Sequence, residues 1–112
     1  MKQYTIIFLL TISLLSICHA QNVYIPDANF KSLLLADLNI NKNRDTAISK
    51  LEAINFTGRI LANVKSISSM KGIEAFTNLT YLHCSGNPFK EIDLSKNIAL
   101  QYLSCVNHHL TS

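Results

Sequence analysis

Two stretches of the chain repeat one another and decide the expected fold: LTYLHCSGNPF at residues 79–89 and LQYLSCVNHHL at residues 100–110. At an offset of 21 residues the apolar positions and one tyrosine recur, while the polar positions differ. The recurring pairs are Leu79/Leu100, Tyr81/Tyr102, Leu82/Leu103, Cys84/Cys105 and Phe89/Leu110. A unit this short cannot bury its own hydrophobic side, so it must stack on a neighbouring copy. The repeat therefore predicts a solenoid of stacked coils with parallel strands.

A degenerate copy precedes these two. Alternating residues from Arg59 onwards predict a strand, and at an offset of 22 residues Ile60 aligns with Leu82 and Ala62 with Cys84. Residues 59–112 should thus hold about three coils, of which the last stops within its repeat at Ser112. Because solenoids need a capping element at each end, we expect a fragment of a longer array, which would self-associate through its open end.

The pattern L-x-x-L-x-C-x-x-N-x-F at residues 79–89 resembles the leucine-rich repeat, in particular the secreted, internalin-like arrays of Bacteroidetes-type bacteria. The resemblance implies an α/β leucine-rich repeat solenoid of about three coils with an N-terminal helical cap. It implies a non-catalytic module that binds a protein or glycan. It also implies that Asn87 bonds backbone groups in the turn after its strand. His108 stands at the corresponding position of the next copy, which predicts a looser third turn.

Residues 1–20 have the features of a secretory signal peptide. Lys2 precedes an apolar run over residues 6–17, and Cys18-His19-Ala20 forms a small-ended cleavage site after Ala20. The run is shorter than the ~20 residues that a membrane span needs. An acylated Cys18 is the alternative, disfavoured because Ile17 is bulky for such a site. The sequence thus predicts a secreted or cell-surface protein without a membrane span in its mature chain.

Residues 21–58 should form the helical cap. Asp27 is a candidate N-cap for an amphipathic helix over about residues 28–38. Ser49 and Glu52 match a capping box, which predicts a second helix that ends near Asn55 or Phe56.

The loop between these helices has the spacing of an EF-hand calcium loop. Its candidate ligands are Asn41, Asn43, Asp45 and Glu52. The first ligand is Asn rather than Asp, and Thr46 replaces the glycine of the sharp turn, so any calcium site should be weak. In the alternative, the loop only joins two helices and Glu52 caps the second. No other cofactor is expected.

Cys84 and Cys105 recur at the same inward position of adjacent copies. An exported chain allows a disulfide between them. Neighbouring parallel strands direct their Cβ atoms side by side, which suits disulfide geometry poorly. We favour two buried free thiols, with the disulfide as the alternative.

The outward positions of the strands form the candidate binding face, because alternate strand residues point to opposite faces. Exposed, in-register tyrosines are large and rigid contact residues, although they could equally serve only to shield the sheet. Stacking the copies gives three rows of candidates: Arg59/Tyr81/Tyr102, Leu61/His83/Ser104 and Asn63/Ser85/Val106.

Other function classes find little support. The formal net charge of +3 is spread along the chain without a basic cluster, so we expect no nucleic-acid partner. No nucleophile-elbow pattern surrounds a serine. His108 and His109 are expected to be adjacent in a turn, where their side chains would diverge and have no acidic or cysteine partner at ligand spacing. We therefore expect that the protein is not an enzyme. The alternative to a binding module is a structural fragment with a degenerate EF-hand-like calcium loop and no binding function of its own.

Overall fold

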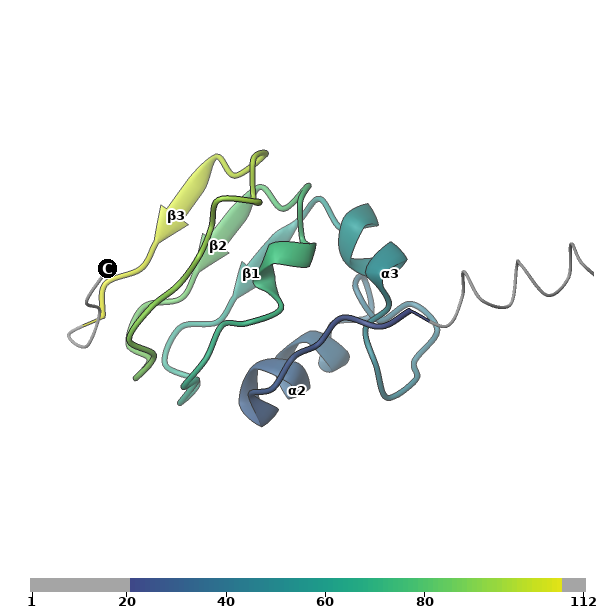
Figure 1. Cartoon of the computed structure of the whole chain (residues 1–112), viewed down its shortest axis with the longest axis horizontal. Coiled ribbons are helices and arrows are strands. Elements are labelled where there is room, and N and C mark those ends of the chain that lie inside the picture. The colour runs from purple at the N-terminus through teal and green to yellow at the C-terminus, as the bar shows by residue number, and fades with distance from the viewer. Residues whose placement is uncertain (1–20, 108–112) are drawn as a thin grey trace, which may run out of the picture.

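The computed structural model describes residues 21–107. The predicted signal peptide at residues 1–20, the predicted cleavage after Ala20, and His108 to Ser112 lie outside the described residues. The elements in chain order are α2 (Ala28–Ala36), α3 (Lys50–Asn55), β1 (Arg59–Leu61), the 3-10 turn η1 (Ile73–Ala75), β2 (Tyr81–His83) and β3 (Tyr102–Ser104). Figure 1 shows the two helices together at one end of the molecule and β3 at the other.

The strands form one parallel sheet in the order β1-β2-β3. The register pairs Arg59 with Tyr81 and Tyr81 with Tyr102, so that Leu82 lies beside both Ile60 and Leu103. The offsets of 22 and 21 residues in the sequence are therefore the register of the sheet. Figure 1 shows the three strands side by side, with long connections returning along one side of the sheet.

The expected leucine-rich repeat solenoid of about three coils is wrong as a description of this fold. The described chain forms an open sheet of three parallel strands beside two helices. Each strand is three residues long, and between the strands only η1 interrupts irregular chain. In the third strand Leu103, the counterpart of buried Leu82, is 48% exposed.

One hydrophobic core lies between the sheet, the helices and the returning segments. Leu82 and Cys84 reach it from β2 and the residue after it, and α2 contributes Phe30 and Leu34. Phe56 and Phe76 meet edge to face with ring centroids 6.3 Å apart. Burial of these side chains supplies the main driving force for the fold, at about 1.5–3 kcal/mol for each large apolar side chain.

Both helices begin at the capping residues expected from the sequence. Asp27 Oδ1 accepts the Phe30 N–H at 2.9 Å, and Ser49 and Glu52 form the reciprocal capping box. The first helix ends at Ala36 rather than at Leu38, because the chain turns to extended geometry at Asp37. Leu38 is consequently half exposed, and Ile40 takes a buried position instead.

Two polar contacts attach α2 to the segment that follows β1. Asp27 Oδ2 accepts the Ser68 N–H at 2.8 Å, and Asn29 Nδ2 donates to the Ser66 carbonyl at 3.0 Å. The helical end and the sheet are thereby held in one body around the shared core. Within residues 21–107, no helix combines the length and the apolar character that crossing a membrane requires.

Candidate binding surface

An arginine and two tyrosines stack across the outer face of the sheet, and we call Arg59, Tyr81 and Tyr102 the tyrosine column. The Arg59 guanidinium carbon lies 4.8 Å from the centroid of the Tyr81 ring. The Tyr81 and Tyr102 rings stack with centroids 4.1 Å apart and an interplanar angle of 6°. Because β2 lies between β1 and β3, Arg59 covers one face of the Tyr81 ring and Tyr102 covers the other.

The strand alternation explains why these three side chains face outward together. In β1 the middle residue, Ile60, is buried while its two neighbours are exposed, and in β2 the middle residue, Leu82, is buried between two half-buried residues. The register then stacks the outward residues of each strand directly beside those of the next. The tyrosine column is thus a consequence of register and pleat.

The other two predicted rows lie beside the column. Leu61, His83 and Ser104 are paired in register, and Leu61 is 46% exposed. The third row lies just past the strands, where Ser85 Oγ is 3.2 Å from Ser104 Oγ and accepts the Val106 N–H at 2.9 Å. Asn63 is half-buried in that row, and Val106 is exposed. All nine predicted residues of the face therefore lie at or directly after adjacent strands.

Two hollows adjoin the Arg59 end of the column. One, of about 170 Å³, lies between the end of α2 and β1 and includes Leu33, Ile40, Asp37 and Arg59 in its lining. The second, of about 460 Å³, is lined by Arg59 and Asp37 again, together with Lys42 and segments that include Asn39, Asn55 and Thr57. Arg59 is therefore the residue that joins the tyrosine column to both hollows.

The environment of the column shifts the ionisation of Tyr81. Partial burial, and in second place the neighbouring Tyr102 phenol, raise the pKa of the Tyr81 hydroxyl above its ordinary value, although the Arg59 charge lowers it in part. The phenol is therefore uncharged at neutral pH and presents a neutral hydroxyl at the edge of the stacked rings.

Asn87 holds the turns behind this face together. Its side chain is 3% exposed, and its Nδ2 donates to the carbonyls of Ala62 at 2.7 Å and Cys84 at 2.9 Å. Its Oδ1 accepts the N–H groups of Lys65 at 2.9 Å and Ile67 at 3.1 Å. One amide thus satisfies buried backbone groups of two successive turns, which fixes β1 against β2.

Asn107, after the third strand, makes similar contacts to the turn before it. Asn107 Oδ1 accepts the Asn87 N–H at 2.8 Å, and its Nδ2 lies 3.3 Å from the Cys84 carbonyl oxygen. His108, at the position of the repeat Asn, lies outside the described residues, so the looser third turn stays a prediction. The interval between the two Asn residues is one shorter than the interval between the two Leu residues, and a fixed offset of 21 missed the match.

Asn97 is a structural residue that the sequence pattern did not reveal. It is 5% exposed, and its Nδ2 donates to the carbonyls of Ile73 and Phe76, each at 2.9 Å. Its Oδ1 is buried without a hydrogen-bond partner in the described chain. The residue fastens the segment before β3 to η1.

The four calcium candidates take part in hydrogen bonds within the loop and at the cap of α3. Glu52 Oε2 accepts the Ser49 N–H in the capping box. Asp45 accepts from Asn43 Nδ2 and the Ala47 N–H through its two carboxylate oxygens. Asn41 is buried and donates to the carbonyls of Leu35 and Asp45, and its Oδ1 has no partner among the described residues. Each candidate is thus engaged in local hydrogen bonds that stabilise the loop.

Cys84 and Cys105 are both free thiols, the first buried and the second half-buried. Burial, with the neighbouring Cys105 in second place, raises the pKa of the Cys84 thiol far above its usual range. Because the thiolate is the reactive species, Cys84 is an inert apolar group that packs in the core.

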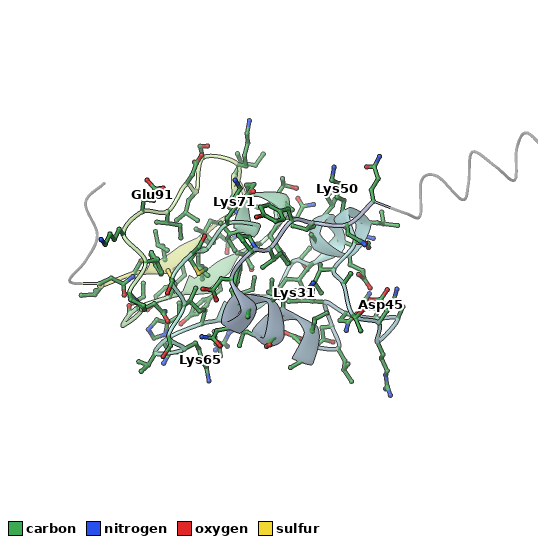
Figure 2. All side chains as sticks on the ribbon, turned by 60° about the horizontal axis from the view of Figure 1, so that its bottom comes forward. Lys31, Asp45, Lys50, Lys65, Lys71 and Glu91 are labelled. Atoms are coloured by element: carbon green, nitrogen blue, oxygen red, sulfur yellow. The ribbon has the colours of Figure 1, made fainter. Side chains whose placement is uncertain are left out.

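The remaining titratable groups and the third hollow lie as follows in the described part of the chain. Within residues 21–107, no three His, Cys, Asp or Glu side chains come together in a way that could hold a metal ion. His83 lies half-buried on the sheet face, and His108 and His109 lie outside the described residues. A hollow of about 500 Å³ lies between the two returning segments, with mixed charges that include Lys71, Glu74 and Glu91. In Figure 2 the labelled lysines lie apart from one another, Lys31 on α2, Lys50 on α3, and Lys65 and Lys71 on the connection between β1 and η1.

Among the comparisons with known proteins, only the comparison with solved structures finds a similarity. No protein-family model matches it, and no curated protein matches it either. A solved structure of CBM51-2 and INT domains from Clostridium perfringens ZmpB is similar, with a TM-score of 0.55 and 23% sequence identity. The similar region covers 76% of this chain and 17% of that chain. At this identity the likeness concerns the fold alone, and it lends no support to the solenoid expected from the repeats.

Proposed function

We propose that this chain is an exported, non-catalytic module that binds a protein or glycan through the sheet face centred on the tyrosine column. The observation that carries the proposal is the stack of Arg59, Tyr81 and Tyr102 on an exposed face. Tyrosine and arginine are the residue types that most often dominate binding energy at interfaces, because they bring large contact area with few rotatable bonds. Because the three side chains stack on one another, rotation about their side-chain bonds is already restricted before a ligand binds.

The surroundings of the column support the same function. Leu61, Tyr102 and Val106 are apolar or aromatic side chains exposed by 46%, 45% and 71%. Such side chains beside a fixed arginine provide both buried apolar area and a directed polar contact. The structurally similar ZmpB protein contains a carbohydrate-binding module, which makes glycans a ligand class to test beside proteins. Export rests on the leader-like residues 1–20.

The experiment compares variants of the face with a matched exposed tyrosine elsewhere. The chain is immobilised and offered a glycan array and a phage-displayed random-peptide library, and affinities of the recovered ligands are measured by calorimetry. Tyr81→Ala and Tyr102→Ala should each lower affinity by about ten-fold or more, as truncation of a central contact residue does. Tyr24→Ala is the control, because Tyr24 is 68% exposed and its ring faces Lys71 away from the column.

Melting temperatures of all variants are measured in parallel, so that a loss of binding is separated from a loss of folding. Ligands whose affinity is the same for wild type, Tyr81→Ala and Tyr102→Ala would contradict the proposal. So would a loss caused equally by Tyr24→Ala.

A further inference from the structure

We infer that the tyrosine column recognises a protein partner that presents an acidic side chain to Arg59. The inference rests on the proposed function and names the ligand class for the same face. It follows from which surfaces of the column are covered and which are open, and from the charges around Arg59.

Most of the aromatic ring faces in the column are covered by other side chains of the same chain. Tyr81 has Arg59 on one face and Tyr102 on the other. A sugar ring binds an aromatic side chain by lying flat on an open ring face, where its C–H groups meet the negative side of the ring. The far face of Tyr102 is the one ring face in the column that no described aromatic or cationic group covers. A sugar ring could therefore stack on one aromatic ring face of the column, that of Tyr102.

The column presents the edges and hydroxyl groups of its rings outward instead. Protein interfaces use tyrosine in this manner, with an apolar ring body beside a hydrogen-bonding tip. Leu61 in the adjacent row adds an exposed aliphatic contact. The mixture of ring edges, hydroxyls and an aliphatic side chain complements a protein surface better than it complements a sugar.

Arg59 gives this surface a directed positive charge. The guanidinium is held against the Tyr81 ring, and the residue lines both hollows beside the column. Lys42 adds a second positive charge to the larger hollow, and Asp37 brings the one carboxylate, which accepts the Asn39 N–H. The local excess is therefore one positive charge. A guanidinium binds a carboxylate through two parallel N–H bonds, so an Asp or Glu side chain of the partner fits this position.

The test selects ligands from both classes in the same assay. Random-peptide phage and an array of neutral and carboxylate-bearing oligosaccharides are offered to the wild-type chain. Recovered peptides should be enriched in Asp or Glu, and Arg59→Gln should lower their affinity about ten-fold or more. Arg59→Lys, which keeps the charge but lacks the planar fork, should recover part of the loss. Replacing the acidic residue of the peptide by its amide should weaken binding to the wild type by a similar factor.

Lys71→Gln is the matched control, because Lys71 is also an exposed cation over a tyrosine ring, at 5.6 Å from Tyr24, and should leave affinity unchanged. Peptides without acidic residues that bind Arg59→Gln as tightly as wild type would overturn the inference. If glycans bind in a way that depends on Tyr102 and no peptide ligand is recovered, the inference is overturned while the proposed function stands. Ligands indifferent to both tyrosines, or no ligand from either library, would count against both.

Discussion

At the scale of single residues, the buried side chain of Asn87 hydrogen-bonds four backbone groups of two successive turns. Its amide bonds backbone groups of Ala62, Lys65 and Ile67 on one side and of Cys84 on the other. Buried backbone groups without partners cost about 1–3 kcal/mol each. The arrangement of β1 and β2, and with it the stack of Arg59 on Tyr81, therefore depends on one side chain remote from the outer face.

We predict that Asn87→Ala lowers the free energy of unfolding by at least about 3 kcal/mol, because it leaves several of these groups unpaired at once. Urea unfolding followed by circular dichroism measures the loss. Asn78→Ala is the control, since Asn78 is exposed and donates one bond to the Ile54 carbonyl, and it should cost less than about 1 kcal/mol. Equal losses for the two variants would show that the buried amide has no special role.

Val64 carries backbone strain that its counterpart in the next copy avoids. It has a φ of 51°, in the left-handed region that β-branched residues disfavour, while Gly86 holds the corresponding turn position with a φ of 74°. Val64 is also 74% exposed, so its side chain buries little area. Val64→Gly should therefore raise the free energy of unfolding by about 1 kcal/mol. Val64→Ala, which keeps a Cβ, should gain less, and thermal unfolding that ranks the two the other way would refute the account of strain.

Tyr81 offers a spectroscopic readout of the column. Partial burial and the Tyr102 phenol raise its pKa, so the folded chain holds the phenolic proton more tightly than the unfolded chain does. This contribution to stability is complete below the unfolded value of about 10 and is lost as pH rises through the folded pKa. NMR titration should place the Tyr81 transition above the ordinary tyrosine value, and Tyr102→Ala should move it back toward that value. A Tyr81 titration identical in both proteins would mean that the rings do not interact.

At the scale of elements, the sequence was informative wherever the signal was local. The N-cap at Asp27 and the capping box at Ser49 identified the starts of both helices, because each depends on residues within one turn. The end of α2 was predicted two residues late. Leu38 continues the apolar spacing, yet the turn at Asp37 exposes it. Where a helix stops depends on tertiary packing that a short apolar pattern does not report.

Asp27 has two functions at the start of α2, and two substitutions separate them. Asn keeps an oxygen for the Phe30 N–H but places an amide donor where the Ser68 N–H is bound, whereas Ala removes both contacts. Asp27→Ala should lower the free energy of unfolding by about 2 kcal/mol, and Asp27→Asn by about half as much. Urea unfolding of both variants tests this, and equal losses would indicate that only one of the two contacts matters.

At the scale of the whole molecule, the repeats predicted the register of the sheet and failed on the architecture. Leu82 and Leu103 are paired, because the offset between copies is a property of neighbouring strands. What the returning segments form, and whether a copy closes into a coil, is not set by that offset. The described chain forms an open sheet in which Leu103 of the third strand is half exposed. The rows of the candidate face could be predicted from the sequence, because they follow from register and pleat. The hollow between α2 and β1 could not, since it depends on how the helix packs beside the strand.

The central claim is that ligands bind at the sheet face around the tyrosine column. NMR mapping of amide shifts in the full chain, during titration with a peptide or glycan recovered in the binding selections, tests it most directly. We predict that the perturbed amides cluster at residues 59–63, 81–85 and 102–106. Perturbations gathered instead along the charged hollow that includes Lys71 and Glu91 would contradict the claim.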